Sequence, residues 1–281
     1  MLKTKNGKPV ASIGQGTWYL GESQRFEDEE IETLKMGINK GMNLIDTAEM
    51  YGSGGAEVLT GKAISSFPRE DLYIVSKVYP FNSSKENIIK ACSNSLKRLN
   101  TSYIDLYLLH WRGSNSLSEV VEGMEELKER GMIRDWGVSN FDIRDMEELF
   151  KVENGDKCLV NQVLYNLDSR GVEFSLLPWM QERNVVIMAY CPLAQGGKLS
   201  KGLLENELVK DIARVHNSSP AQVLLAFLCS KALVVPIPRT KQIEYAIQNA
   251  EAMDIKLTKE ELDRLDQEFP PPNRKMPLDI Q

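Results

Sequence analysis

Histidine and cysteine are scarce in this sequence. The only two histidines, His110 and His216, lie far apart among the 281 residues. A protein zinc site draws on clustered histidine and cysteine ligands, so no dedicated zinc site is expected. Four cysteines are spread along the chain without a Cys-x-x-Cys pair, namely Cys92, Cys158, Cys191 and Cys229. In the absence of an export signal, they are expected to be reduced thiols of a cytoplasmic protein.

Long apolar runs and basic stripes are also missing. The opening residues MLKTKNGKPV lack the apolar stretch of a secretory signal, and no later run is long enough to span a bilayer. The formal net charge is -6, and lysine and arginine do not gather into the stripe that nucleic-acid binding requires. We therefore expect neither a membrane nor a nucleic-acid partner. The sequence does not indicate an oligomeric state.

The chain instead repeats one pattern, in which a short apolar run precedes an amphipathic stretch. The runs are GQGTW, GMNLIDTA, DLYIVSK, IDLYLLH, IRDWGVSN, CLVNQ, NVVIMAY and LVVPIP. Each is too short for a buried helix and is rich in residues that favour strands. The alternation is typical of βαβ units around a parallel sheet. No linker rich in proline, glycine or serine divides residues 1–281, so one domain is expected.

Helix ends can be predicted from capping residues. Ser83 and Glu86 have the spacing of a capping box, and so do Thr258 and Glu261. Gly131 follows an apolar stripe and is free to adopt the left-handed conformation of a helix end.

Polar residues at the ends of the runs distinguish the two possible parallel folds. An open, doubly wound sheet concentrates its functional groups at one switch point, whereas a barrel presents them around a ring. Almost every run here ends in such a group: Asp46, Lys77, His110, Asn140, Gln162 and Tyr190. We therefore predict an α/β fold of the (β/α)8 TIM-barrel type.

Four residues form the candidate catalytic group. Asp46, Lys77 and His110 end three runs, and Tyr51 follows Asp46 by five residues. A charged side chain at a buried strand tip is costly unless it is paired, so barrel closure should bring Asp46 and Lys77 together. A phenol is a weak acid at neutral pH, and a neighbouring ammonium is expected to lower its pKa. This acid suits the reduction of a carbonyl, with hydride supplied by a nicotinamide or a flavin.

Several segments together resemble the aldo-keto reductase superfamily over nearly the whole chain. They are GMNLIDTAEMYGSG, IVSKV, LYLLHW, GVSNF, VNQVLYN, AYCPLAQG and PIPRTKQIEYAIQNA, and they follow one another in the family's order. The resemblance implies an NADP-dependent oxidoreductase that reduces aldehydes or ketones to alcohols. Tyr51 would be the proton donor, and Asp46, Lys77 and His110 would complete the tetrad.

The same resemblance implies a cofactor site that binds NADPH, with NADH possible. Its residues would be Gly16, Thr17, Trp18, Asp46, Ser139, Asn140, Gln162, Tyr190, Cys191, Leu193, Gln195, Gly196, Arg239, Thr240, Lys241, Tyr245, Gln248 and Asn249. Ser139, Asn140 and Gln162 would bind the nicotinamide carboxamide, and Tyr190 would stack on its ring. Leu193 to Gly197 would cover the pyrophosphate. Gln248 and Asn249 would contact the adenine.

Two positions depart from the family's pattern. Cys191 stands where many members have serine, which weakens one expected pyrophosphate hydrogen bond. Arg239 can place two donors on a 2′-phosphate, with Thr240 and Lys241 beside it. Tyr245, however, replaces an arginine found in many NADP-preferring members. NADPH is therefore expected, but with weakened discrimination against NADH.

The substrate is expected to be a small carbonyl compound. Trp18, Tyr79, His110 and Trp111 lie at or beyond strand ends and could form an apolar substrate pocket. Only PPPNRKMPLDIQ follows the last predicted helix, which favours an open pocket and a broad substrate range.

Two other functions are compatible with the pattern. A nucleotide-sensing regulatory subunit would keep the cofactor site with little turnover. A Schiff-base aldolase on the same barrel would use Lys77 as its imine-forming lysine.

Overall fold

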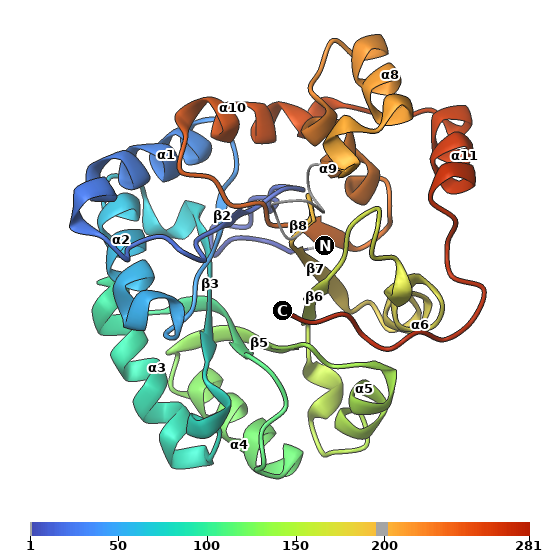
Figure 1. Cartoon of the computed structure of the whole chain (residues 1–281). Coiled ribbons are helices and arrows are strands. Elements are labelled where there is room, and N and C mark those ends of the chain that lie inside the picture. Colours follow the sequence, from blue (N-terminus) through green and yellow to red (C-terminus); the bar gives the residue numbers. More distant parts are fainter. Residues whose placement is uncertain (1, 195–201) are drawn as a thin grey trace.

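Eight parallel strands occupy the centre of the molecule (Figure 1). The computed structural model describes residues 2–194 and 202–281. The strands are β1 (Gln15–Gly16), β2 (Leu44–Asp46), β3 (Tyr73–Val78), β4 (Ile104–Leu109), β5 (Ile133–Ser139), β6 (Val160–Leu164), β7 (Val186–Tyr190) and β8 (Val234–Pro236). Each pairs in parallel with the next along the chain. Each overlaps a run predicted from sequence, although β3 extends one residue and β6 two residues beyond the predicted run.

Backbone hydrogen bonds close the sheet into a barrel. Gly14 N–H donates to the Pro236 carbonyl over 2.9 Å, and Gly16 N–H donates to the Pro238 carbonyl over 2.9 Å. A Cβ at Gly16 would lie 2.9 Å from the Ile237 carbonyl oxygen, so a side chain there would push the first and last strands apart. The prediction of a (β/α)8 barrel rather than an open sheet is confirmed.

Helices surround the strands on the outside (Figure 1). Those described are α1 (Glu27–Asn39), α2 (Gly55–Ile64), α3 (Lys85–Leu99), α4 (Leu117–Glu129), α5 (Ile143–Leu149), α6 (Leu176–Glu182), α8 (Glu207–Val215), α9 (Pro220–Cys229), α10 (Ile243–Glu251) and α11 (Lys259–Glu268). Their apolar faces pack on the barrel: Ile88, Cys92 and Leu99 of α3, for example, belong to the main buried cluster. Within the described ranges, no helix has the length and apolar character needed to traverse a bilayer.

One of the two predicted capping boxes is correct. Thr258 and Glu261 cap α11 reciprocally, as expected. The prediction for Ser83 is wrong, because α3 is capped by Ser84, whose hydroxyl accepts from Asn87 N–H. The Ser83 hydroxyl instead donates to the Pro80 carbonyl in the preceding turn. Two adjacent serines offer the same chemistry, and only the path of the turn decides which one caps the helix.

The barrel interior consists of stacked layers of inward-facing side chains. Successive side chains of a strand point to opposite faces, so every second residue faces inward. One buried layer contains Leu44, Val75, Leu108, Val160 and Met188. Two residues further along the same five segments stand Asp46, Lys77, His110, Gln162 and Tyr190. The polar groups are thus the continuation of the apolar layer toward the carboxyl ends of the strands, where barrels build their sites.

Candidate active site

Asp46 and Lys77 form a fully buried ion pair at the ends of β2 and β3. The Lys77 Nζ donates to Asp46 Oδ2 over 2.8 Å and to the Thr47 carbonyl over 2.8 Å. The other Asp46 oxygen, Oδ1, accepts from Gln162 Nε2 over 2.7 Å. Burial raises the pKa of Asp46 and lowers that of Lys77, and the attraction between the two charges opposes both changes. The ion pair and its hydrogen bonds offset part of the desolvation cost of both charges.

Tyr51 completes this cluster from the loop after β2. Its hydroxyl oxygen accepts a hydrogen bond from Lys77 Nζ over 3.1 Å. Since Lys77 is the donor, the phenolic proton is directed away from the lysine. The loop is held by close backbone contact, because a Cβ on Gly55 would lie 2.3 Å from the Gly21 carbonyl oxygen. The predicted meeting of Tyr51 and Lys77 is thus present.

The predicted acidification of Tyr51 is wrong. Burial raises the pKa of the Tyr51 phenol well above its ordinary value, and the Asp46 charge raises it further. The phenolate is disfavoured because it would have to form in a dry site beside a carboxylate. Tyr51 is therefore held in its protonated form, which is the form a proton donor requires.

His110 faces Tyr51 across the pocket. The two rings meet edge to face, with centroids 5.6 Å apart. Burial lowers the pKa of His110 to about 2, and the Lys77 charge adds to this effect. The Nδ1 atom of His110 is buried and has no hydrogen-bond partner among the described residues. A neutral imidazole at this position can donate one hydrogen bond without carrying a charge.

A polar wall on β5 to β7 lies next to the tetrad. The Ser139 hydroxyl donates to the Gln162 carbonyl over 2.8 Å, and Asn140 Nδ2 donates to the His110 carbonyl over 3.2 Å. The Tyr190 hydroxyl donates to Asn140 Oδ1 over 2.8 Å. These bonds fix the orientation of each side chain while leaving hydroxyl and amide groups at the pocket surface.

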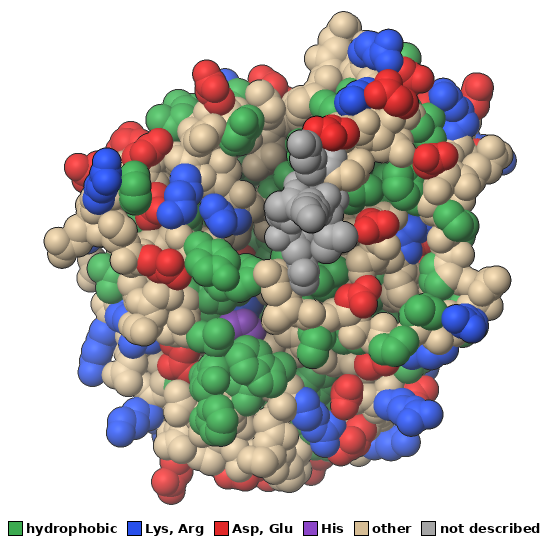
Figure 2. All heavy atoms as spheres, in the orientation of Figure 1, with side chains coloured by type: hydrophobic (Ala, Val, Ile, Leu, Met, Phe, Trp, Pro, Cys, Tyr) green, Lys and Arg blue, Asp and Glu red, His purple; other side chains and the backbone are tan. Residues whose placement is uncertain are grey.

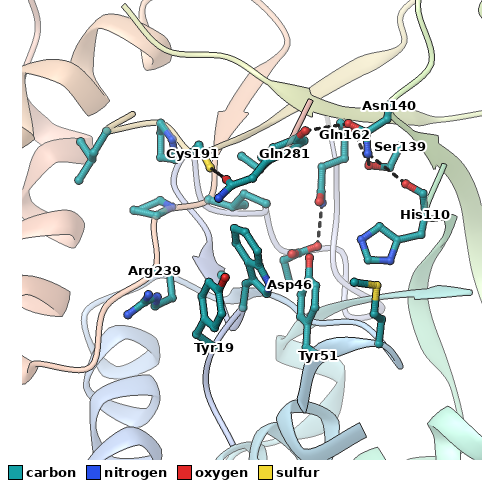
Figure 3. A pocket seen from close by; sticks show the side chains of 18 of the residues that line it. Tyr19, Asp46, Tyr51, His110, Ser139, Asn140, Gln162, Cys191, Arg239 and Gln281 are labelled. Atoms are coloured by element: carbon teal, nitrogen blue, oxygen red, sulfur yellow. Dashed lines mark hydrogen bonds between the residues drawn. The ribbon is translucent and has the colours of Figure 1, made fainter. Parts of the chain in front are cut away.

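These groups line one pocket of about 440 Å³. Figure 3 shows Tyr51, Asp46 and His110 on one side of it and Arg239 with Tyr19 on the other. Of the predicted site residues, the lining includes Gly16, Trp18, Asp46, Tyr51, His110, Trp111, Ser139, Asn140, Gln162, Tyr190, Cys191, Leu193 and Arg239. In Figure 2 a histidine is visible in the middle of this face, with hydrophobic side chains gathered beside it.

Other predicted residues lie outside the lining. Lys77 is buried beneath it, and Thr17 is fully buried with its hydroxyl donating to the Asp46 carbonyl. Tyr79 packs edge to face on Trp111, with centroids 5.1 Å apart, and so stands behind the pocket wall. Gln195 and Gly196 lie outside the described residues.

The predicted adenosine end is more open. Arg239 is exposed, and its guanidinium lies 5.8 Å from the Tyr19 ring centroid. Tyr245 is 51% exposed, and Thr240 is only partly covered. Lys241 points to α1, where its Nζ pairs with Glu30 over 2.9 Å. Gln248 and Asn249 follow on α10.

Several pocket residues were not predicted. Four of them lie next to predicted residues in the sequence, so they could have been found from that proximity: Tyr19, Met50, Ile237 and Pro238. Gln281 had no such neighbour. The segment after α11 returns to the middle of the barrel (Figure 1), where Gln281 Oε1 accepts from Cys191 Sγ over 2.9 Å. The expectation that this short segment leaves the pocket open is therefore wrong on this side.

The donor set fits a nicotinamide cofactor. A carboxamide needs both donors and acceptors, and the hydroxyl and amide groups of Ser139, Asn140 and Gln162 supply both at one wall. The Tyr190 ring beside them offers an apolar face for a flat heterocycle. At the other end, the Arg239 guanidinium makes no ion pair or hydrogen bond with another described residue. It is thus available to a phosphate.

Lys77 is poorly suited to imine formation. Its three donors are directed to Asp46, Thr47 and Tyr51. A Schiff base requires a free amine lone pair on an accessible nitrogen, whereas this ammonium is fully buried. The geometry therefore does not support the aldolase alternative.

Comparisons with known proteins agree with this geometry. The model of the aldo/keto reductase family matches residues 12–268. The chain is 48% identical to methylglyoxal reductase YeaE of Escherichia coli over 280 residues, covering 100% of this chain and 98% of that protein. It is 34% identical to glyoxal reductase of Bacillus subtilis, covering 94% of this chain and 91% of that protein.

A solved structure extends the likeness to three dimensions. The aldo/keto reductase from Klebsiella pneumoniae, in complex with NADP and acetate, superimposes with a TM-score of 0.96. That protein is 46% identical, and the match covers 100% of both chains. On the family match, the close relatives and the shared barrel, the chain belongs to the aldo/keto reductase family.

Proposed function

We propose that this protein reduces small 2-oxoaldehydes to hydroxy-carbonyl products with NADPH, and that Tyr51 donates the proton. It is an NAD(P)H-dependent oxidoreductase of carbonyl compounds. One observation carries the assignment of roles: Lys77, paired with Asp46 in the buried part of the site, donates a hydrogen bond to the Tyr51 oxygen.

Each member of the tetrad has a distinct task. Tyr51 is protonated in the resting site, so it can transfer its proton to the carbonyl oxygen as charge develops there. Lys77 donates to the phenol oxygen and stabilises the phenolate left behind. Asp46 holds the lysine in position. His110 is neutral and can donate a hydrogen bond that orients the carbonyl oxygen.

When bound, NADPH would supply the hydride for the carbonyl carbon. Ser139, Asn140 and Gln162 would hold its carboxamide, and Tyr190 would stack on the ring. Arg239 and Thr240 would hold the 2′-phosphate. Gln162 also donates to Asp46, so the cofactor wall and the catalytic ion pair share a side chain. Through this link Gln162 would orient a bound nicotinamide relative to the Asp46–Lys77 pair.

The relatives support a small dicarbonyl as substrate. Their names state that they are reductases of methylglyoxal and of glyoxal. Trp18, Trp111 and Met50 narrow the pocket beside Tyr51 and His110 with apolar surface. Such walls exclude water and leave the carbonyl oxygen to the two polar residues.

The direct test compares the rates at which wild type and Tyr51→Phe reduce methylglyoxal with NADPH. The rate is measured as the decrease of nicotinamide absorbance. The variant should lose roughly 10²–10⁴-fold in kcat/KM, the usual range for a lost general acid. Binding of NADPH, followed by fluorescence, should remain within about twofold of wild type. Turnover close to wild type in the variant would show that Tyr51 is not the proton donor.

A second arm of the same experiment tests the substrate class. Methylglyoxal and phenylglyoxal should be turned over with higher kcat/KM than acetone or acetophenone, whose carbonyls are less electrophilic. Equal rates on simple ketones would contradict the 2-oxoaldehyde assignment and leave the Tyr51 assignment intact. Wild type that binds NADPH tightly but reduces none of these compounds would instead favour the nucleotide-sensing alternative.

A further inference from the structure

Glu30 is a buried carboxylate at the adenosine end that the catalytic scheme does not use. Its side chain is 1% exposed although it lies in the first turn of a helix, α1. Glu30 Oε2 accepts from Gly21 N–H over 2.8 Å, and Oε1 pairs with Lys241 Nζ over 2.9 Å. Glu30 therefore joins the loop after β1 to the loop after β8.

Lys241 is held toward α1 by more than this ion pair. The Thr33 hydroxyl, one helical turn after Glu30, lies within hydrogen-bond distance of two carbonyl oxygens and shares its proton between them: Glu29 at 2.8 Å and Lys241 at 3.1 Å. The ammonium also lies 5.6 Å from the centroid of the Phe26 ring. Backbone and side chain of Lys241 are thus both attached to α1.

Arg239, two residues earlier, is in the opposite situation. Its guanidinium has no ion pair or hydrogen bond with any other residue in the described part of the chain, and it borders the pocket beside Tyr19. Figure 3 shows Arg239 and Tyr19 together at the side of the pocket away from His110. Of the two cations after β8, only Arg239 is therefore directed to the pocket.

We propose that Glu30 is a specificity-determining residue for the cofactor: it neutralises Lys241 and leaves Arg239 as the cation that recognises the 2′-phosphate. The inference rests on the proposed NADPH site. The carboxylate and the ammonium form a neutral pair at contact distance, so at the range of a nearby phosphate their fields largely cancel. The preference for NADPH over NADH then depends on one arginine, Arg239. Glu30 sets the size of this preference by cancelling the charge of Lys241.

The proposal predicts the effect of changing each charge. Glu30→Gln keeps an oxygen that can accept from Gly21 N–H but leaves Lys241 uncompensated, so it should increase the preference for a 2′-phosphate by roughly threefold. Lys241→Gln should decrease it by a similar factor, because the Glu30 charge is then unbalanced. The double variant Glu30→Gln/Lys241→Gln should keep the wild-type preference.

Isothermal titration calorimetry with adenosine 2′,5′-bisphosphate and AMP measures this preference without turnover. The ratio of the two Kd values is the readout, and the AMP value reports whether the pocket is intact. Glu32→Gln is a matched control, because it removes one negative charge from an exposed position of α1 that pairs with Lys35. It should leave the ratio unchanged. Arg239→Met should remove most of the preference.

The outcomes separate this inference from the proposed function. A double variant that loses as much preference as Arg239→Met would show that Lys241 itself contacts the phosphate, and would overturn the role of Glu30. An unchanged ratio in Glu30→Gln, with wild-type AMP affinity, would also overturn it. Wild type that binds neither nucleotide would instead contradict the cofactor site.

Discussion

The two ends of the pocket differ in how they hold charge. At the catalytic end, Lys77 is fully buried and all three of its donors are used within the protein. At the adenosine end, Arg239 is exposed and pairs with no other described residue. Both ends lie at the carboxyl ends of neighbouring barrel strands, so the fold alone does not account for the difference.

The difference follows from what each end has to do. Proton transfer needs groups at fixed distances, which buried and fully bonded side chains provide at a high desolvation cost. Recognition of a phosphate needs a cation that can adjust in water, where its removal costs little in stability. Changes at the catalytic end should therefore affect folding and turnover together, whereas a change of the exposed Arg239 at the adenosine end should affect affinity alone.

The largest effect is expected for Lys77→Met. Asp46 would remain as an unpaired buried carboxylate, which typically costs about 3–5 kcal/mol of stability. Turnover of methylglyoxal should fall by roughly 10²–10⁴-fold, since the phenolate loses its ammonium partner. Urea denaturation and kcat/KM measure the two effects. The double variant Asp46→Asn/Lys77→Met should regain part of the stability but none of the activity. Equal stability of both variants would contradict the buried ion pair.

His110 should make stability depend on pH. Its pKa is lowered to about 2 in the folded protein, against about 6.5 in an unfolded chain. Between these values the unfolded chain binds a proton that the folded protein does not, so stability is lost as pH falls below about 6.5. The expected slope is about 1.4 kcal/mol per pH unit. Urea denaturation between pH 6.5 and pH 4.5 should show wild type losing about 2 kcal/mol more than His110→Gln, because the full slope is reached only below pH 6.5. Parallel profiles would mean that His110 is solvated.

Arg239→Met should act on affinity alone. The NADPH Kd should rise by roughly tenfold, as for a lost charge-assisted contact, while the NADH Kd stays within about twofold. The urea midpoint should be unchanged, because the guanidinium has no ion pair or hydrogen bond with another described residue to lose. Fluorescence titration with both cofactors measures the first effect. A similar loss for NADH would show that Arg239 binds a part common to both cofactors.

The smallest effect is expected for Tyr245→Arg. The side chain is 51% exposed, so the substitution adds a charge without disturbing the core. NADPH affinity should increase by roughly threefold, and the gain should fade in high salt because the charge is solvated. Tyr245→Lys at the same position tests whether charge alone suffices. No gain from either substitution would place position 245 beyond reach of the 2′-phosphate.

Much of the catalytic end could be predicted because its pattern is local. Leu44 and Asp46, Val75 and Lys77, or Leu108 and His110 each show a buried position followed two residues later by a polar one. Strand periodicity then places all the polar groups on the inner face. The N-terminal cap of α3 was predicted one residue early, since Ser83 and Ser84 are chemically alike. The direction of the Tyr51 pKa change was also wrong, because the extent of burial cannot be read from residue types.

Two contacts between distant segments escaped prediction. Gln281 contacts Cys191, which lies 90 positions earlier in the sequence, and no sequence pattern around either residue predicts this contact. Lys241 was expected beside the phosphate, yet its charge is directed to Glu30, 211 residues earlier in the chain. The sequence around a lysine near the surface does not predict which of several carboxylates will pair with it.

The order of polar and apolar residues along each strand was enough to predict the barrel and the ring of polar groups at the carboxyl ends of its strands, because period-two alternation is a local property. The choice of Tyr51 as proton donor is a prediction that rests on the chemistry of a phenol and on the resemblance to the family. Only the tertiary structure decided how dry the site is, which cation remains unpaired and what covers the pocket. Desolvation and ion pairing depend on everything packed around a group, and that environment is assembled from segments far apart in the chain.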